Sequence, residues 1–146
     1  MPGPLARIGA VALVSAVVCH GAVGQVGNMS LWDHISKLTG PDAADCGTHP
    51  LVASAPEAMH QSLACARDAA QQHRAFEIIQ RGPGEDSEIA RGLLGERDGS
   101  TFWFDYDSAP CGGPGCAERF ETKPCVLSNV VVLHDVDGRH QFRCVR

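Results

Sequence analysis

Apolar residues recur at helical spacing in two segments of the first half of the chain. The first segment begins at Ser30, where Ser30 and Asp33 have the pattern of a capping box, and it ends at Gly40-Pro41. Its apolar positions are Leu31, Ile35 and Leu38. We expect a short helix that must dock on a larger surface, because isolated helices of this length are marginal in water.

A longer helix is expected to follow and to end between Gln72 and Arg74. Ser54 is placed to cap it, and Pro56 lies in the first turn, where its missing N–H is harmless. One face of this helix carries Met59, Leu63, Ala66 and Ala70. Between the two helices, the composition of residues 42–52 indicates a loop.

The second half of the chain alternates between apolar and polar residues, which is the pattern of half-buried strands. The expected strands cover residues 76–82, 89–97, 100–107, 130–136 and 139–145, and Phe120 begins a further short one. Asp-Gly dipeptides at 98–99 and 137–138 separate four of these strands into two pairs. Because Asp-Gly favours two-residue turns, each pair is expected to form a tight hairpin.

A two-residue turn fixes the register of each hairpin. The facing pairs expected in the first are Leu93 with Phe104 and Leu94 with Trp103. The side chains expected to share its core face are Ile89, Leu93, Phe102, Phe104 and Tyr106. The facing pairs expected in the second are Leu133 with Phe142 and Val131 with Cys144. Cys144 then points inward, where Cys125 can reach it.

This order of elements predicts an α+β fold, with one short and one longer N-terminal helix packed on one face of an antiparallel meander of four or five strands. Residues 25–53 supply the first helix and a loop, and residues 54–146 supply the helix-plus-sheet core of the same domain. The order resembles that of cystatin-like folds and of the small helix-plus-sheet modules of bacterial envelope proteins, in topology alone. No family motif is present.

The first 24 residues have the pattern of a cleavable signal peptide. One basic residue, Arg7, precedes an apolar stretch from Ile8 to Cys19, which is shorter than the roughly 20 residues of a membrane span. Small residues at positions 22 and 24 place the cleavage just before Gln25. Cys19 suggests a lipid anchor as an alternative, but Val18 stands where such an anchor requires a small residue. An uncleaved helix is the other alternative.

Removal of Cys19 with the leader leaves six of the seven cysteines, an even number that indicates a disulfide framework in a short exported chain. Six cysteines allow 15 pairings. Local structure favours Cys46–Cys65, Cys111–Cys116 and Cys125–Cys144. The alternative of a zinc site is disfavoured, because no C-x-x-C pair is present and the spacings match no standard metal template.

The formal net charge of −5 and the scattered basic residues disfavour binding to nucleic acid, whose phosphates attract basic stripes. Arginine greatly outnumbers lysine, a usage typical of bacteria with GC-rich genomes. No second long apolar segment follows the leader, so no membrane span is expected after cleavage. The expected location is the bacterial periplasm or the exterior of the cell.

The histidines form no recognised metal-binding motif, and we expect neither a metal nor a cofactor. The densest group is His134, Asp135 and His140 around the second turn, which is either a weak divalent-metal site or a polar hairpin tip. Asp105 and Asp107 share a strand face with Trp103 and have the spacing of paired carboxylates. General acid chemistry requires one of them to stay protonated near neutral pH, and nothing in the sequence enforces that. We therefore assign no catalytic residue.

One apolar strip suits a binding function. On the expected register, Trp103 and Leu94 lie on the face opposite the long helix, together with Val130 and Val132. The alternative is that the first helix covers this strip. The loop closed by Cys111 and Cys116, with Gly112 and Gly113 inside it, is expected beside the strip as a rigid specificity element.

Three functions remain open. The first is a non-catalytic binding or structural protein that contacts a protein partner through the Trp103 face. The second is a secreted enzyme inhibitor that inserts the disulfide-fixed loop into a cleft. The third is a small hydrolase with Asp105 or Asp107 as acid or base, which a pocket beside Asp105 would favour.

Overall fold

The computed structural model describes residues 29–113 and 115–145. The expected leader, with Cys19 and the cleavage position before Gln25, lies outside these residues. In chain order the elements are α1 (Leu31–Thr39), β1 (Ala44–Pro50), α2 (Pro56–Gln71), β2 (Phe76–Pro83), β3 (Glu88–Gly95), β4 (Thr101–Asp107), β5 (Arg119–Pro124), a 3-10 turn (Leu127–Asn129), β6 (Val130–His134) and β7 (His140–Cys144).

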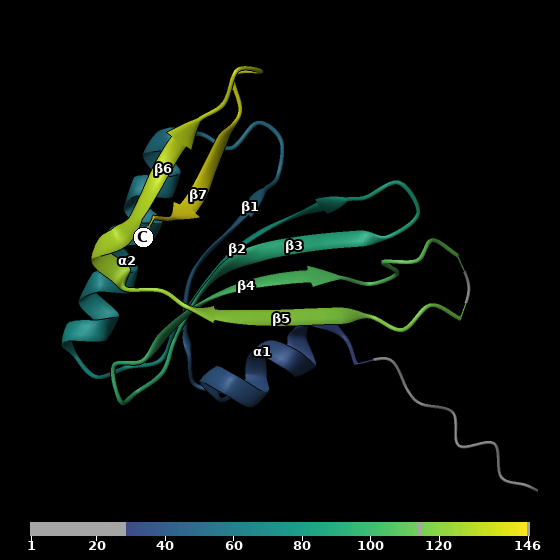
Figure 1. The fold of residues 1–146 in the computed structure, drawn as a ribbon. Coiled ribbons are helices and arrows are strands. Elements are labelled where there is room, and N and C mark those ends of the chain that lie inside the picture. Colours follow the sequence, from purple (N-terminus) through teal and green to yellow (C-terminus); the bar gives the residue numbers. More distant parts are fainter. Residues whose placement is uncertain (1–28, 114, 146) are drawn as a thin grey trace, which may run out of the picture.

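Five strands form one sheet in the order β1-β2-β3-β4-β5, and β6 and β7 form a separate hairpin (Figure 1). Strands β2 to β5 form an antiparallel meander, whereas β1 runs parallel to β2 and α2 connects the two. The α+β class is therefore confirmed. The expectation of a purely antiparallel sheet is wrong, because the expected loop at 42–52 contains an edge strand. The expected meander also contained the strands at 130–136 and 139–145, and this part of the expectation is wrong, because they pair only with each other.

The two helices lie on opposite faces of the sheet, as Figure 1 shows. Helix α2 packs on β1 and β2 and shares its face with the β6–β7 hairpin, and we call this side the hairpin face. Helix α1 packs on β2 and β3 from the other side, the α1 face. The domain thus has three layers instead of the expected two, and both faces of the sheet are buried over part of their area.

The helix ends follow the sequence signals with one exception. At α1 the capping box forms, since Ser30 Oγ accepts a hydrogen bond from the Asp33 N–H and the Asp33 carboxylate accepts one from the Ser30 N–H. At α2 the N-cap is Ala55, and the expected cap, Ser54, donates its hydroxyl to the Pro50 carbonyl instead. Ser54 therefore ties the start of α2 to the end of β1.

Strand β1 lacks the alternation that predicts strands, because its sequence is ADCGTHP. Its pairing with β2 shifts register between Asp45 and Thr48, and Gly47 at this irregularity has φ of +123°. A Cβ atom on Gly47 would lie 2.7 Å from Ser62 Oγ of α2. Only glycine lets the strand pass this close to the helix, so tertiary packing, and not local propensity, makes β1 a strand.

Both Asp-Gly hairpins close with three-residue loops instead of the expected two-residue turns. In the first, the Gly99 N–H donates to Glu96 O at 3.1 Å, and the Glu96 N–H donates to Ser100 O at 2.8 Å. This is a type I turn with glycine in the left-handed position that follows it, and Gly99 has φ of +92°. The second hairpin repeats the pattern with Gly138 at φ of +77°.

The longer loops move both registers by one residue from the expected ones. The facing pairs are Leu93 with Trp103, Leu94 with Phe102, Gly92 with Phe104, Val132 with Phe142 and Val130 with Cys144. Because side chains alternate between faces, a one-residue shift separates residues that were expected to lie together. Leu93 faces α2, whereas Phe104 and Tyr106 join Leu94 on the α1 face, so the single expected core face is wrong.

Three disulfides connect the pairs favoured by the sequence: Cys46–Cys65, Cys111–Cys116 and Cys125–Cys144. The first joins β1 to α2, and the third joins the end of β5 to the end of β7. The second closes the loop between β4 and β5. Two of the three bridges therefore fasten the layer that covers the hairpin face.

A buried side-chain amide joins the β6–β7 hairpin to the middle of the sheet. Gln80 of β2 is fully buried, its Nε2 donates to His140 O at 3.2 Å, and its Oε1 accepts from the Phe142 N–H at 3.0 Å. The amide therefore pairs with the edge of β7 as a neighbouring strand would. Phe142 then lies in the core against α2, with 2% of its surface exposed.

We expect Gln80→Met to lower the free energy of unfolding by about 2–4 kcal/mol. It preserves the side chain's approximate volume but leaves one buried carbonyl and one buried N–H of β7 without partners. Urea unfolding followed by circular dichroism measures the loss. Gln61→Met makes the same chemical change on the exposed face of α2 and should alter stability little. Equal effects of the two substitutions would contradict the role of Gln80.

The disulfides should differ in what they contribute to stability. Replacing Cys111 and Cys116 by alanine should cost about 1 kcal/mol less than removing either bridge with a sequence separation of 19, because a separation of 5 restricts the unfolded chain less. Urea unfolding of the three paired variants under oxidising conditions gives the order. A Cys111–Cys116 variant as unstable as the other two would refute this ranking.

Candidate functional site

A cleft of about 430 Å³ lies between β7 and the hairpin face of the sheet. Its floor comes from three strands: Arg91 of β3, Trp103 and Asp105 of β4, and Lys123 and Pro124 of β5. Its wall is the run from Gln141 to Cys144 on β7. The volume falls within the usual range of small-molecule and peptide side-chain sites.

The strand register brings the floor residues together. Arg91 is directly opposite Asp105, and Trp103 is directly opposite Lys123, so these four side chains emerge on the same face. Leu93 lies on the same face of the sheet, opposite Trp103, and is buried under the hairpin layer. The cleft thus begins where the apolar core of the hairpin face ends.

Strand β7 is held over this floor at three points. Arg91 Nη1 donates to Gln141 Oε1 at 3.3 Å, which joins the floor to the wall directly. Gln80 holds the backbone of β7 from beneath, and the Cys125–Cys144 disulfide closes the end of the cleft beside Pro124. A site held by a disulfide and buried hydrogen bonds is preorganised, which lowers the entropy cost of binding.

The cleft is cationic although the chain is acidic. Arg91, Lys123 and Arg143 contribute three positive charges and Asp105 one negative charge, whereas the whole chain has a formal net charge of −5. Among the described residues, none of the three cations has a carboxylate oxygen within 4.0 Å. Positive charge that no internal carboxylate neutralises is available to an external anion.

The residues of the cleft suit binding better than covalent chemistry. Its lining contains no serine, histidine or free thiol that could act as a nucleophile or as its base. Asp105 is the only carboxylate among the lining residues, and elsewhere in the described part of the chain no group of three or more potential metal ligands occurs. At the hairpin tip His134 and His140 stack with ring centroids 4.7 Å apart.

The structure separates the residues expected to form one binding face. Trp103 is half-buried and lines the cleft, whereas Leu94 is fully buried on the α1 face with Phe104. The one-residue shift of the first hairpin explains this error. Gly112 and Gly113 follow the far end of β4, nine and ten residues beyond Trp103, and are not among the residues that line the cleft.

The two aspartates considered for catalysis are both on the hairpin face of β4. Asp105 contributes to the cleft, and together with Asp107 it also lines a smaller hollow of about 210 Å³ that includes Arg119 and Glu121. Both carboxylates are half-buried. Asp105 thus lines both hollows, whereas Asp107 lines only the smaller one.

Sequence reasoning missed four residues of the cleft: Arg91, Lys123, Gln141 and Arg143. None of the four was expected to have a role, because single polar residues within strands carry no signal of their own. The correct three-residue loops would have placed Arg91 and Trp103 on the same face. No sequence signal reveals that β7 folds over that face, because the contact depends on the polar residue Gln80 in a buried strand.

A serine and a histidine pair in the core between α2 and β1. His49 Nε2 lies 2.7 Å from Ser62 Oγ, both residues are buried, and the ring of His49 contacts Phe142 edge-on at 5.6 Å. Burial lowers the pKa of His49, because the interior disfavours the charged imidazolium. Both side chains lie in the packed layer between α2 and β1, so we interpret the pair as part of that packing.

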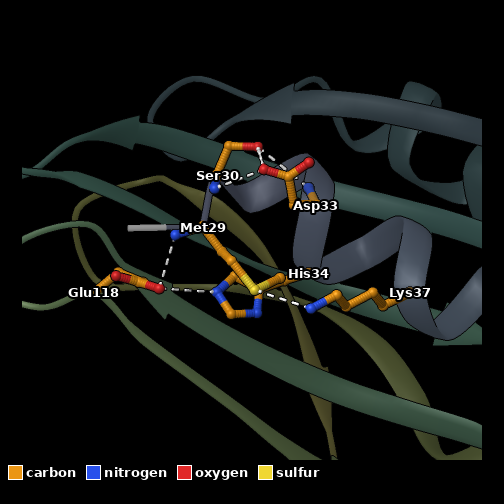
Figure 2. A network of polar contacts seen from close by, with 6 residues as sticks. All are labelled: Met29, Ser30, Asp33, His34, Lys37 and Glu118. Carbon is orange, nitrogen blue, oxygen red and sulfur yellow. Dashed lines mark hydrogen bonds and ion pairs between the residues drawn. The ribbon is translucent and has the colours of Figure 1, made fainter. Parts of the chain in front are cut away.

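A second polar network, drawn in Figure 2, anchors the start of α1. His34 stacks on Phe120 of β5 at 4.5 Å, and its Nε2 lies 3.5 Å from Glu118 Oε1. The Met29 N–H donates to the same carboxylate at 2.9 Å and holds the pKa of Glu118 below its usual value. Lys37 Nζ donates to Met29 Sδ at 3.1 Å. These contacts fix α1 over the edge of the sheet.

No family model matches this chain, and no characterised protein or solved structure shows significant similarity to it. The topological resemblance to cystatin-like folds gains no support from these comparisons. Function is therefore inferred from the geometry of the cleft.

The buried His49 should make the protein sensitive to mild acid. Its folded-state pKa lies below that of the unfolded chain, so its contribution to stability is present above about pH 6.5 and is lost as the pH falls through the lowered folded value. The free energy of unfolding should therefore decrease between pH 7.5 and pH 5.5 in urea titrations. His49→Gln should flatten this decrease, and His60→Gln on the exposed face of α2 should not. An identical slope in wild type and His49→Gln would exclude His49 as the cause.

Proposed function

We propose that this chain is a non-catalytic binding protein of an oxidising compartment, and that it contacts its partner through the Trp103 cleft. The observation that carries this proposal is the preorganised cleft itself, in which three cations without internal carboxylate partners surround a half-buried tryptophan. Tryptophan and arginine are the residue types that dominate binding energy at protein interfaces. Nucleic acid is a poor candidate, because the net charge of the chain repels a polyanion.

The compartment is part of the same proposal. Three disulfides persist only where thiols are not continuously reduced, which is the situation in the periplasm and outside cells. No helix in the described residues is long and apolar enough to cross a membrane. We propose that residues 1–24 direct export and are removed before Gln25, and that Cys19 leaves with them without serving as a lipid anchor.

Two alternative functions use other parts of the surface. The Cys111–Cys116 loop is exposed around Gly112, and a Cβ at Gly112 or Gly113 would meet nothing within 4 Å, as an inhibitory loop requires. Asp105 lines a cleft, which favours the hydrolase alternative. Asp105 is the only carboxylate that lines the cleft, and the lining has no histidine, serine or free thiol to act with it, so binding remains the better-supported function.

The test uses Trp103 as its own reporter. Trp32→Phe removes the other tryptophan, which is 45% exposed on α1, and leaves Trp103 as the only one in the chain. Acidic, basic and neutral pools of short synthetic peptides are titrated against this variant while indole fluorescence and the indole N–H resonance are recorded. We expect at least one pool to perturb Trp103, because a ligand in the cleft must cover its ring.

The matched control is Trp103→Phe, in which Trp32 is the only reporter and should not respond to the same pool. If backbone amide resonances are recorded in the same titration, changes confined to residues 111–116 would favour the inhibitor alternative. No response of Trp103 to any of the three pools would contradict the proposed function.

A further inference from the structure

The charges of the cleft select among ligands by sign. Arg91, Lys123 and Arg143 converge on it from three different strands, and Asp105 alone opposes them. Elsewhere on the described surface, four other arginines are each within 4.0 Å of a carboxylate: Arg81, Arg97, Arg119 and Arg139. The cleft therefore concentrates positive charge that the fold does not neutralise.

The guanidinium of Arg91 is held in a fixed position in the cleft. Its side chain is half-buried, and the hydrogen bond from Nη1 to Gln141 Oε1 fixes the guanidinium against the wall of the cleft. A guanidinium has five N–H donors in a planar fork that matches a carboxylate, and this single hydrogen bond leaves the others for a ligand. Partial burial also reduces screening by salt, so a carboxylate here binds more strongly than at a fully exposed arginine.

Asp105 and Trp103 restrict the ligand further. Asp105 faces Arg91 across the strand pair and repels a densely charged polyanion, but it can accept a hydrogen bond from an amide N–H. Trp103 offers an aromatic surface to an apolar side chain. A peptide provides all three groups together, since it carries side-chain carboxylates, backbone N–H donors and apolar side chains.

We propose that the cleft binds an acidic peptide segment of a partner protein, with carboxylate side chains on Arg91, Lys123 and Arg143 and an apolar side chain on Trp103. This proposal rests on the proposed binding function and specifies its ligand. It predicts that affinity depends on local positive charge in the cleft and not on the charge of the protein as a whole.

The experiment is a titration of Trp103 fluorescence in the Trp32→Phe protein. The probes are one acidic peptide that contains glutamate, aspartate and a leucine, and its neutral counterpart with glutamine and asparagine. We expect saturable binding of the acidic peptide, weaker by on the order of tenfold for the neutral one, because charge-assisted hydrogen bonds are lost. Raising the salt concentration from about 50 to about 500 mM should also weaken binding of the acidic peptide.

A pair of double variants separates local from global charge. Lys123→Gln with Arg143→Gln removes two exposed cations of the cleft and should weaken acidic-peptide binding by on the order of tenfold. Arg67→Gln with Arg74→Gln removes two exposed cations on or next to α2, outside the cleft, and should change it less than about twofold. All four sites are exposed, and matching thermal melts verify that each variant is folded.

The other outcomes are distinct. Equal affinity for the acidic and neutral peptides would overturn the acidic-segment proposal and leave the binding function intact. Binding of inorganic pyrophosphate or a sulfated disaccharide in place of the acidic peptide would overturn it in favour of a phosphate or sulfate ligand. Equal weakening by both double variants would show a nonspecific charge effect and also overturn it. Absence of any Trp103 response would contradict the binding function itself.

Discussion

The arrangement of the hairpin face depends on the buried amide of Gln80. A hairpin of two five-residue strands cannot persist alone in water, and β6–β7 must dock to exist. Gln80 makes that docking specific, because its amide offers one donor and one acceptor at the spacing of a neighbouring strand. An apolar residue at this position would bury as well but would not define where β7 lies. The cleft is the space that this placement leaves between β7 and the outer strands.

The disulfides reinforce the same layer. Cys46–Cys65 fixes α2 to the edge strand β1, and Cys125–Cys144 fixes the end of β7 to the end of β5. Between these two staples lies the core of Met59, Leu63, Ile78 and Phe142, all buried. A small domain buries a limited fraction of its surface, so its core supplies limited stability. The disulfides in this layer add stability that the core alone does not supply. The rigidity of the cleft follows from stability requirements of the fold.

The sequence patterns predicted the individual helices and most strands well, but they predicted poorly how these elements pair and pack. Both helices, the two Asp-Gly hairpins and the pairing of six cysteines follow from local signals such as the Ser30–Asp33 capping box. Strand β1 escaped prediction because its residues have no alternation and Gly47 interrupts it. The Asp-Gly dipeptides were ambiguous, since glycine serves both two-residue turns and the bulge of three-residue loops. That one-residue difference moved Trp103 away from Leu94 and concealed Arg91 as its neighbour in the cleft.

The contrast between an acidic chain and a cationic cleft has a consequence for selectivity. At physiological ionic strength, charges more than about 8 Å apart are largely screened. A distant partner therefore experiences little of the positive potential of the cleft or of the negative potential of the whole chain. Close to the surface, the net charge of −5 disfavours uniformly acidic molecules, whereas Arg91, Lys123 and Arg143 favour a carboxylate within the cleft itself. For the proposed ligand, the two effects together would favour a short acidic segment on a partner whose remaining surface is neutral or basic. Discrimination of this kind combines a site that attracts the ligand with a surrounding surface that repels other acidic molecules.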